Sequence, residues 1–202
     1  MELELRKIKK QDYKKAIQYA IEGMHFSIYT ESKIILNLYG KYFWYLELLN
    51  ATQILALYYG NDLAGVLIAD IYGETKCYKS FSKSIYIKFI DFIQKHFYKG
   101  SIDLYDNTNK KLLAKYKREN APDGEIRFLA ANPNLKIKGI GTMLLQELEK
   151  REKGKEVYLF TDDQCTYQFY EHRGFEKVGE KDIVLDLNKK IPLKCLLYRK
   201  KI

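Results

Sequence analysis

The sequence has few cysteines and histidines, and neither residue type is clustered. The three cysteines, Cys77, Cys165 and Cys195, are odd in number, lie far apart and include no Cys-x-x-Cys pair, and the three histidines are equally scattered. Such spacings argue against a disulfide framework and against a cysteine–histidine zinc site. We therefore expect reduced thiols and no bound metal.

Long apolar runs are also missing. The most apolar region, from Ile34 to Tyr59, is interrupted by Lys41, Glu47 and Asn50, whereas a membrane span needs roughly 20 mostly uncharged residues. The first residues alternate charged side chains with leucine and lack the apolar segment of a secretory signal. We expect a cytoplasmic protein that does not bind a membrane.

No repeat and no low-complexity linker divides the chain. Its 202 residues, 47% hydrophobic and 30% charged, can form one domain with a sizeable core. We expect a single domain over residues 1–202 with an insertion at about 73–124, where the sequence changes character. The 35 Lys and Arg against 26 Asp and Glu give a net charge of +9. This excess favours a polyanionic partner: a nucleic acid, an anionic surface or a phosphorylated cofactor.

Hydrophobic periodicity predicts an α/β fold, because short apolar runs alternate with amphipathic stretches. The expected strands are Leu3–Ile8, Ile54–Tyr59, Leu63–Tyr72, Glu125–Ala131, Val157–Phe160, Phe175–Leu187 and Ile191–Arg199. The expected helices are Gln11–Gly23, a second one capped by Thr30-Glu31-Ser32, Ser80–Phe97, Asn109–Glu119, one after Thr142, and one from Thr161-Asp162-Asp163 to Arg173. Gly60-Asn61-Asp62 predicts a hairpin turn.

A loop with two glycines follows the strand Glu125–Ala131. It reads Lys136-Ile137-Lys138-Gly139-Ile140-Gly141-Thr142 and leads into a helix. Glycines let a backbone approach a ligand closely, and the free amides at the start of a helix bind anions. The lysines add positive charge, so the loop suits a pyrophosphate, although such glycines can also form a simple tight turn. The spacing fits neither a P-loop nor a Rossmann fingerprint.

A second motif, from Asp163 to Phe175, contains Phe169-Tyr170 and ends in Arg173-Gly174-Phe175. With the two-glycine loop in front of it, this C-terminal part resembles the GNAT superfamily of acyl-CoA-dependent N-acetyltransferases. The resemblance covers roughly Gly124 to Arg199. It implies a mixed, twisted central sheet flanked by helices, with the helical insertion placed before the fourth strand.

The resemblance also implies roles for individual residues. The coenzyme A pyrophosphate would be held by the backbone amides of Lys138, Gly139, Ile140, Gly141 and Thr142, with Lys136 beside them. The pantetheine arm would pair with the strand end Leu129-Ala130-Ala131. Tyr170 matches the tyrosine that acts as general acid toward the departing thiolate, although it could instead be a core aromatic. Asp163 stands where many members have an asparagine that contacts the cofactor arm, and it could instead cap a helix.

An attacking amine must lose a proton, because an alkylammonium has a pKa near ~10.4. Glu125 is the candidate general base, since Gly124-Glu125-Ile126-Arg127-Phe128 resembles the strand of the histone acetyltransferase branch. Its alternative role is a strand-end carboxylate paired with Arg127. Asp70 and Asp163 are further candidates. Lys136 stands where the family usually has Gln or Arg. It keeps a positive charge but lacks the planar fork that contacts a phosphate through two hydrogen bonds.

We therefore expect an enzyme that transfers acetyl from acetyl-CoA directly to the primary amine of a small molecule through a ternary complex. The alternatives are acetylation of a protein N-terminus or lysine, a non-catalytic acyl-CoA sensor and, more remotely, a nucleic-acid-binding module. The insertion would form part of the acceptor site or a lid, or else a stabilising flap or a homodimer contact.

Overall fold

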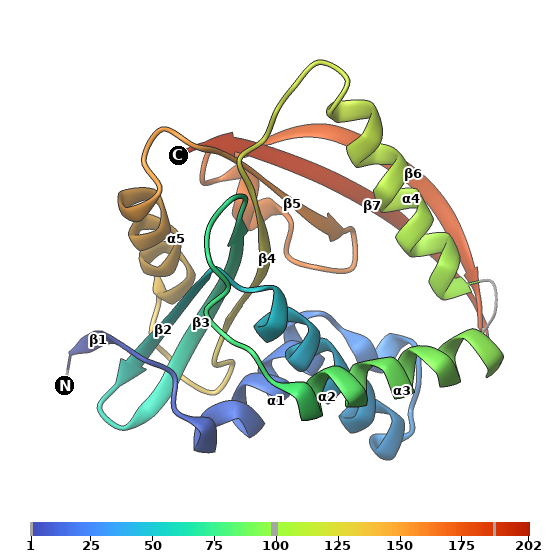
Figure 1. The fold of residues 1–202 in the computed structure, drawn as a ribbon, viewed down its shortest axis with the longest axis horizontal. Helices are drawn as coiled ribbons and strands as arrows, with labels where there is room; N and C mark the ends of the chain where they lie inside the picture. The colour runs from blue at the N-terminus through green and yellow to red at the C-terminus, as the bar shows by residue number, and fades with distance from the viewer. Residues whose placement is uncertain (1, 98–100, 188) are drawn as a thin grey trace.

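One sheet runs through the residues described by a computed structural model, which are 2–97, 101–187 and 189–202 (Figure 1). The sheet has seven strands in the order β1-β2-β3-β4-β5-β7-β6. They are β1 (Leu3–Arg6), β2 (Gln53–Tyr59), β3 (Asp62–Ile71), β4 (Gly124–Ala131), β5 (Glu156–Asp162), β6 (Glu176–Asp186) and β7 (Lys190–Lys201). Only β4 and β5 pair in parallel, so the predicted mixed α/β sheet is confirmed.

Helices cover both faces of the sheet (Figure 1). They are α1 (Tyr13–Gly23), α2 (Lys33–Asn50), α3 (Phe81–Phe97), α4 (Ser101–Tyr116), α5 (Ile140–Arg151) and α6 (Gln168–Glu171), with single 3-10 turns at Lys10–Asp12 and Phe26–Ile28. α3 packs on α2, and α4 lies along β6 and β7 (Figure 1). Within the described ranges no helix is both long and apolar enough to cross a bilayer.

Strand β3 shows how the two faces are divided. Its residues alternate: Leu67 and Ala69 pack into the core under α5, whereas Val66 and Ile68 pack with Trp44 of α2. Both sets are fully buried, which explains why β3 is an almost continuous apolar run. Each fully buried aliphatic side chain stabilises the fold by about 1.5–3 kcal/mol.

The predicted hairpin at Gly60-Asn61-Asp62 is confirmed, and the last two predicted strands form a second hairpin. β2 and β3 pair antiparallel through the turn at Gly60, whose φ of 60° favours glycine, and β6 pairs antiparallel with β7. Residue 188 of the second turn lies outside the described residues. The Ser32 cap is also confirmed, because its Oγ accepts a hydrogen bond from the amide of Ile35 at 3.5 Å.

The helices of the insertion differ from the prediction in two ways. α4 begins at Ser101 instead of Asn109. The sequence pattern missed its first turns because polar Asn109 lies on the buried side of the helix and interrupts the apolar periodicity. α3 occupies the predicted range, but its stripe of large side chains faces outward: Phe81 is 83% exposed, and Phe89 is exposed as well. Up to residue 94, where side-chain burial is described, the residues of α3 that are buried are Ile87 and Ile90.

The helix predicted between Thr161 and Arg173 is much shorter than expected. α6 covers only Gln168–Glu171. Thr161 and Asp162 still belong to β5, and Asp162 Oδ1 accepts hydrogen bonds from the amides of Gln164 and Cys165 at 3.0 and 3.2 Å. This side-chain turn satisfies the same amides that a helix would have used.

Strands β4 and β5 pair for two residues only and then diverge (Figure 1). The pairs are Gly124 with Val157 and Glu125 with Tyr158. Directly after them, Arg127 is an extra residue in β4, a bulge opposite the step from Ile68 to Ala69 in β3. Bulges bend a strand and often accompany functional sites. From Ile126 to Ala131, the edge of β4 that faces β5 pairs with no strand among the described residues.

Candidate active site

The two-glycine loop begins α5 without a side-chain cap. Gly139 is the N-cap residue with a left-handed φ of 87°, and no atom lies within 4 Å of the position where a Cβ would stand. The first helical hydrogen bond runs from the amide of Met143 to the carbonyl of Gly139 at 2.9 Å. Within the described chain, the preceding amides of Ile140, Gly141 and Thr142 donate to no backbone carbonyl. Three N–H groups are therefore free to bind an anion.

Three cationic side chains accompany these amides. Lys136 and Lys138 are exposed on the loop itself. Arg173, which follows α6, donates from Nε and Nη2 to Oγ1 of Thr142 at 2.9 and 2.6 Å. A pyrophosphate or phosphate is multiply charged, so the free amides and the three cations together fit the phosphate groups of coenzyme A.

Gly141 joins the loop to the second motif. A Cβ at Gly141 would stand 3.0 Å from Cζ of Phe169, so the absence of a side chain lets this ring pack against the start of α5. Tyr170 follows, with its ring edge-to-face against Phe169 at 5.3 Å and against Phe175 at 5.5 Å. Burial, and then the nearby Cys165, raise the pKa of Tyr170, which keeps its hydroxyl protonated.

The strand end predicted to bind pantetheine, Leu129-Ala130-Ala131, has a strand partner along one of its two edges. Ala131, Ala130 and Leu129 pair with Gly65, Val66 and Leu67 of β3, respectively. Their other edge faces the gap in pairing between β4 and β5. Because backbone N–H and C=O groups need partners, this edge can accept an extended amide-bearing chain.

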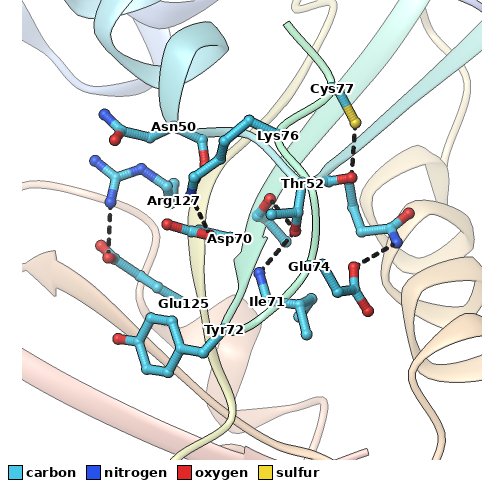
Figure 2. A network of polar contacts seen from close by, with 12 residues as sticks. Asn50, Thr52, Asp70, Ile71, Tyr72, Glu74, Lys76, Cys77, Glu125 and Arg127 are labelled. Atoms are coloured by element: carbon cyan, nitrogen blue, oxygen red, sulfur yellow. Dashed lines mark hydrogen bonds and ion pairs between the residues drawn. The ribbon is translucent and has the colours of Figure 1, made fainter.

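Arg127 connects two carboxylates at the point where β4 and β5 separate. Its Nη1 donates to Glu125 at 2.8 Å (Figure 2), while its Nε and Nη2 donate to the two carboxylate oxygens of Glu47 on α2 at 2.5 and 3.3 Å. Glu125 also accepts a long hydrogen bond of 3.4 Å from the hydroxyl of Tyr158. The predicted pairing of Glu125 with Arg127 is therefore present, and Glu47 completes a triad.

Burial makes both carboxylates of this triad harder to ionise. Burial raises the pKa of Glu47 to about 7, although Arg127 opposes the shift, and Glu47 is only 4% exposed. The pKa of Glu125 is also raised by burial, again against the effect of Arg127. A carboxyl group with a raised pKa is better matched to removing a proton near neutral pH.

The two alternative carboxylates have partners elsewhere. Asp70 lies opposite Glu125 across β3 and β4 and is paired with Lys76 at 2.6 Å, as Figure 2 shows. Asp163 accepts a hydrogen bond from the amide of Lys194 in β7 at 2.9 Å. It does not cap α6, whose N-cap residue is Tyr167.

Two residues of the site were not identified from the sequence. Glu47 was visible only as a charge within the apolar run of α2, and Arg173 only as the residue before a helix-terminating glycine. Their importance comes from partners that are 80 and 31 positions away, Arg127 and Thr142. No group of three or more His, Cys, Asp or Glu side chains in the described ranges is arranged to hold a metal ion.

Comparisons with known proteins identify the family and the fold. The family model of the acetyltransferase (GNAT) family matches residues 19–175. No curated protein matches the sequence.

Several solved structures have a similar fold. PaiA N-acetyltransferase from Thermoplasma acidophilum, in complex with coenzyme A, is 18% identical, with full coverage of both chains (100% each) and a TM-score of 0.54. An apo form of a mutant agmatine N-acetyltransferase is 10% identical, with 99% of each chain covered and a TM-score of 0.59. The ribosomal-protein-alanine N-acetyltransferase from Brucella melitensis is 14% identical, with 98% of this chain and 99% of that chain covered and a TM-score of 0.53. At such identities these structures show a shared fold.

Proposed function

The chain belongs to the GNAT family of acetyltransferases, and from this premise we propose that it transfers acetyl directly to the primary amine of a small molecule. The family uses acetyl-CoA, so the enzyme is an acyltransferase with acetyl-CoA as co-substrate. The observation that carries the proposal is the set of free amides at Ile140, Gly141 and Thr142 next to the unpaired edge of β4. The free amides can hold the diphosphate, while the unpaired edge of β4 aligns the pantetheine arm.

Glu125 is the proposed general base. It lies in the last residue pair before β4 and β5 diverge, and Arg127 fixes the position of its carboxylate. Accepting a proton from the incoming ammonium leaves a neutral nitrogen, which attacks the thioester carbonyl. The C–N bond then forms and the C–S bond breaks, and the second proton of the acylated nitrogen passes to the departing thiolate, so that the products are the amide and the free thiol of coenzyme A.

Tyr170 is the proposed donor to this thiolate. Its ring is fixed between Phe169 and Phe175, and its raised pKa keeps the hydroxyl protonated at neutral pH. Because a thiol is a stronger acid than this phenol, Tyr170 would act chiefly by hydrogen bonding to the developing charge.

Direct transfer is favoured over an acyl-enzyme. A nucleophilic cysteine must be a thiolate, whereas burial raises the pKa of Cys165 to about 12, with Asp162 adding to the shift. Cys195 is also buried, and its pKa is likewise raised to about 12.

Replacing the loop glycine tests the proposal. Gly139→Ala would force an alanine to φ 87°, at a cost of about 1–2 kcal/mol, or reorient the free amides. We expect the Kd for coenzyme A, measured by calorimetry, to rise about 10-fold.

Gly154→Ala is the matched control. Gly154 has a φ of 89°, and it too has no atom within 4 Å of a Cβ, but it lies in the turn between α5 and β5. Its variant should lose similar thermal stability and keep the wild-type Kd. Equal Kd values for coenzyme A in the wild type, Gly139→Ala and Gly154→Ala would contradict a coenzyme A site at the two-glycine loop. Saturable binding with no thiol release on any primary amine would indicate a sensor instead of an enzyme.

A further inference from the structure

A chain of hydrogen bonds connects an exposed lysine to the proposed base. Lys117, directly after α4, donates from Nζ to the hydroxyl of Tyr72 at 3.4 Å, and this Nζ lies 4.9 Å from the centre of the Tyr72 ring. The hydroxyls of Tyr72 and Tyr158 are 2.6 Å apart. The hydroxyl of Tyr158 in turn donates to Oε2 of Glu125 at 3.4 Å. The two hydroxyls between Lys117 and Glu125 are called here the hydroxyl chain.

The direction of these hydrogen bonds follows from the chemistry of the two ends. An ammonium group can only donate, an ionised carboxylate can only accept, and a phenol hydroxyl has one proton to donate. Because Tyr158 gives its proton to Glu125, its oxygen accepts from Tyr72. The oxygen of Tyr72 accepts from Lys117. Every donor in the hydroxyl chain therefore points toward Glu125, and hydrogen bonds aligned in this way strengthen one another.

Tyr158 is held in place by the sheet and by the insertion. It pairs with Glu125 in the parallel register of β4 and β5, and it is only 2% exposed. Its ring belongs to a buried cluster with Tyr116 of α4 and Leu197 of β7, and it meets Phe160 edge-to-face at 5.6 Å. Such packing leaves the ring one position, so its hydroxyl is fixed beside the carboxylate. α4 thereby covers the side chain that reaches Glu125.

The hydroxyl chain and Arg127 bind the same oxygen of Glu125. Arg127 donates from Nη1 to Oε2 at 2.8 Å, and Tyr158 donates to Oε2 as well. No donor among the described residues binds the other oxygen, Oε1. The carboxylate is therefore held through Oε2 from two neighbouring strands, β4 and β5, which leaves Oε1 to accept the proton of an acceptor amine.

The ionisation of Glu125 depends on the groups that surround it. These are Glu47 of α2, Asp70 of β3, Arg127 of β4, Tyr158 of β5 and Lys117 after α4. Burial raises the pKa of Glu125, whereas Arg127 and the hydroxyl of Tyr158 lower it. Asp70 raises this pKa as well, and Lys117 lowers it. Without the hydroxyl chain, Glu125 would hold its proton at higher pH and could not accept another there.

We propose that Tyr158 is a positioning residue for the general base. With Tyr72 and Lys117 behind it, Tyr158 holds Oε2 of Glu125, favours the ionised carboxylate and leaves Oε1 for the acceptor. This inference rests on the proposed N-acetyltransferase function with Glu125 as the base. It also gives the insertion a role, because α4 covers the ring of Tyr158 and is followed directly by Lys117.

Tyr158→Phe tests the positioning role, because it removes the hydroxyl and keeps the ring. Loss of the hydrogen bond raises the pKa of Glu125, so the acid limb of the kcat/KM profile should move to higher pH. We expect kcat/KM, measured as thiol release from acetyl-CoA, to fall about 3–10-fold on this limb and less than about 2-fold on the plateau. Tyr116→Phe is the matched control, because Tyr116 lies in the same buried cluster but donates to Glu156.

Lys117→Met tests the outer end of the hydroxyl chain at an exposed position, where folding is not at risk. It should move the acid limb in the same direction by a smaller amount, and high salt should reduce the difference from wild type, because salt screens an exposed charge. Lys115→Met, at a nearby exposed lysine of α4, is its control. If the two hydroxyls act in series, Tyr72→Phe combined with Tyr158→Phe should lose no more than Tyr158→Phe alone.

NMR titration of isotope-labelled glutamate follows the ionisation of Glu125 without turnover, with Glu125→Gln to assign the signal. Its midpoint should move to higher pH in Tyr158→Phe and Lys117→Met and stay unchanged in Tyr116→Phe and Lys115→Met. An unchanged midpoint in Tyr158→Phe, or an equal loss of activity at every pH, overturns the positioning role and leaves Glu125 as the base. Full activity of Glu125→Gln overturns the base itself, and the positioning role falls with it.

Discussion

Among single residues, Arg127 determines how two carboxyl groups are arranged. One guanidinium holds both oxygens of buried Glu47 and one oxygen of Glu125. Arg is suited to this task because its planar group donates in several fixed directions and stays charged. Fixing Glu125 in this way leaves a carboxylate whose pKa is raised by burial, in a position to accept a proton.

Glu125→Gln should lower kcat/KM at pH 7 by about 10²–10³-fold, because the ammonium then has no proton acceptor. The loss should shrink as the pH approaches the ammonium pKa of ~10.4, where the amine is deprotonated without help. In the wild type, activity should fall as the pH falls through the raised pKa of Glu125, since only its ionised form accepts a proton. Asp70→Asn is the comparison: if it alone shows this pH signature, Asp70 is the base.

Tyr170→Phe should lower kcat by about 10²-fold while the Kd for coenzyme A stays at the wild-type value. The variant removes only the hydroxyl and keeps the ring between Phe169 and Phe175. Tyr167→Phe, which removes a hydroxyl at the N-cap of α6, serves as the control in the same thiol-release assay. Full turnover of Tyr170→Phe across the pH range would rule out the donor role.

At the scale of elements, the divergence of β4 from β5 creates the unpaired edge. Parallel pairing stops after Glu125, and the bulge at Arg127 bends β4 directly beyond that point. α5 then begins close by, because Gly65 of β3 leaves room for Ile140: a Cβ at Gly65 would stand only 2.5 Å from Cγ2 of Ile140. The two-glycine loop and the unpaired edge of β4 are thereby neighbours.

Hydrogen exchange measures this edge directly. We expect coenzyme A to slow amide exchange in the segment 126–131 by about an order of magnitude, because a pantetheine arm would satisfy amides that β5 leaves free. The segment 62–71 of β3 is the internal control, since it already pairs with both β2 and β4. Unchanged exchange in 126–131 at saturating coenzyme A would mean that the arm binds elsewhere.

For the whole molecule, the net charge of +9 conceals an uneven distribution. Lys136, Lys138 and Arg173 surround the free amides at the start of α5, whereas Asp91 and Asp106 lie with the tyrosines between α2 and the insertion helices. Acetyl-CoA, the co-substrate of this family, is a polyanion. The positive charge near the start of α5 is therefore suited to attracting it.

Most elements were predictable because local rules govern them. The β2–β3 turn, the Ser32 cap and the loop before α5 each depend on a few consecutive residues. The predicted start of α4 and the predicted length of α6 were wrong. In α4 a polar residue lies on the buried side, and before α6 the side chain of Asp162 competes for the helix amides.

The sequence by itself determined the strand and helix order, the two-glycine loop at Gly139 and the family resemblance, because each is encoded in short-range spacing. Only the tertiary structure decided that Arg127 binds Glu47, that Arg173 joins the loop through Thr142, and that Tyr42 binds Asp91. These contacts join residues far apart in the chain. They depend on strand register and on how α2, α3 and α4 pack, which no local pattern specifies.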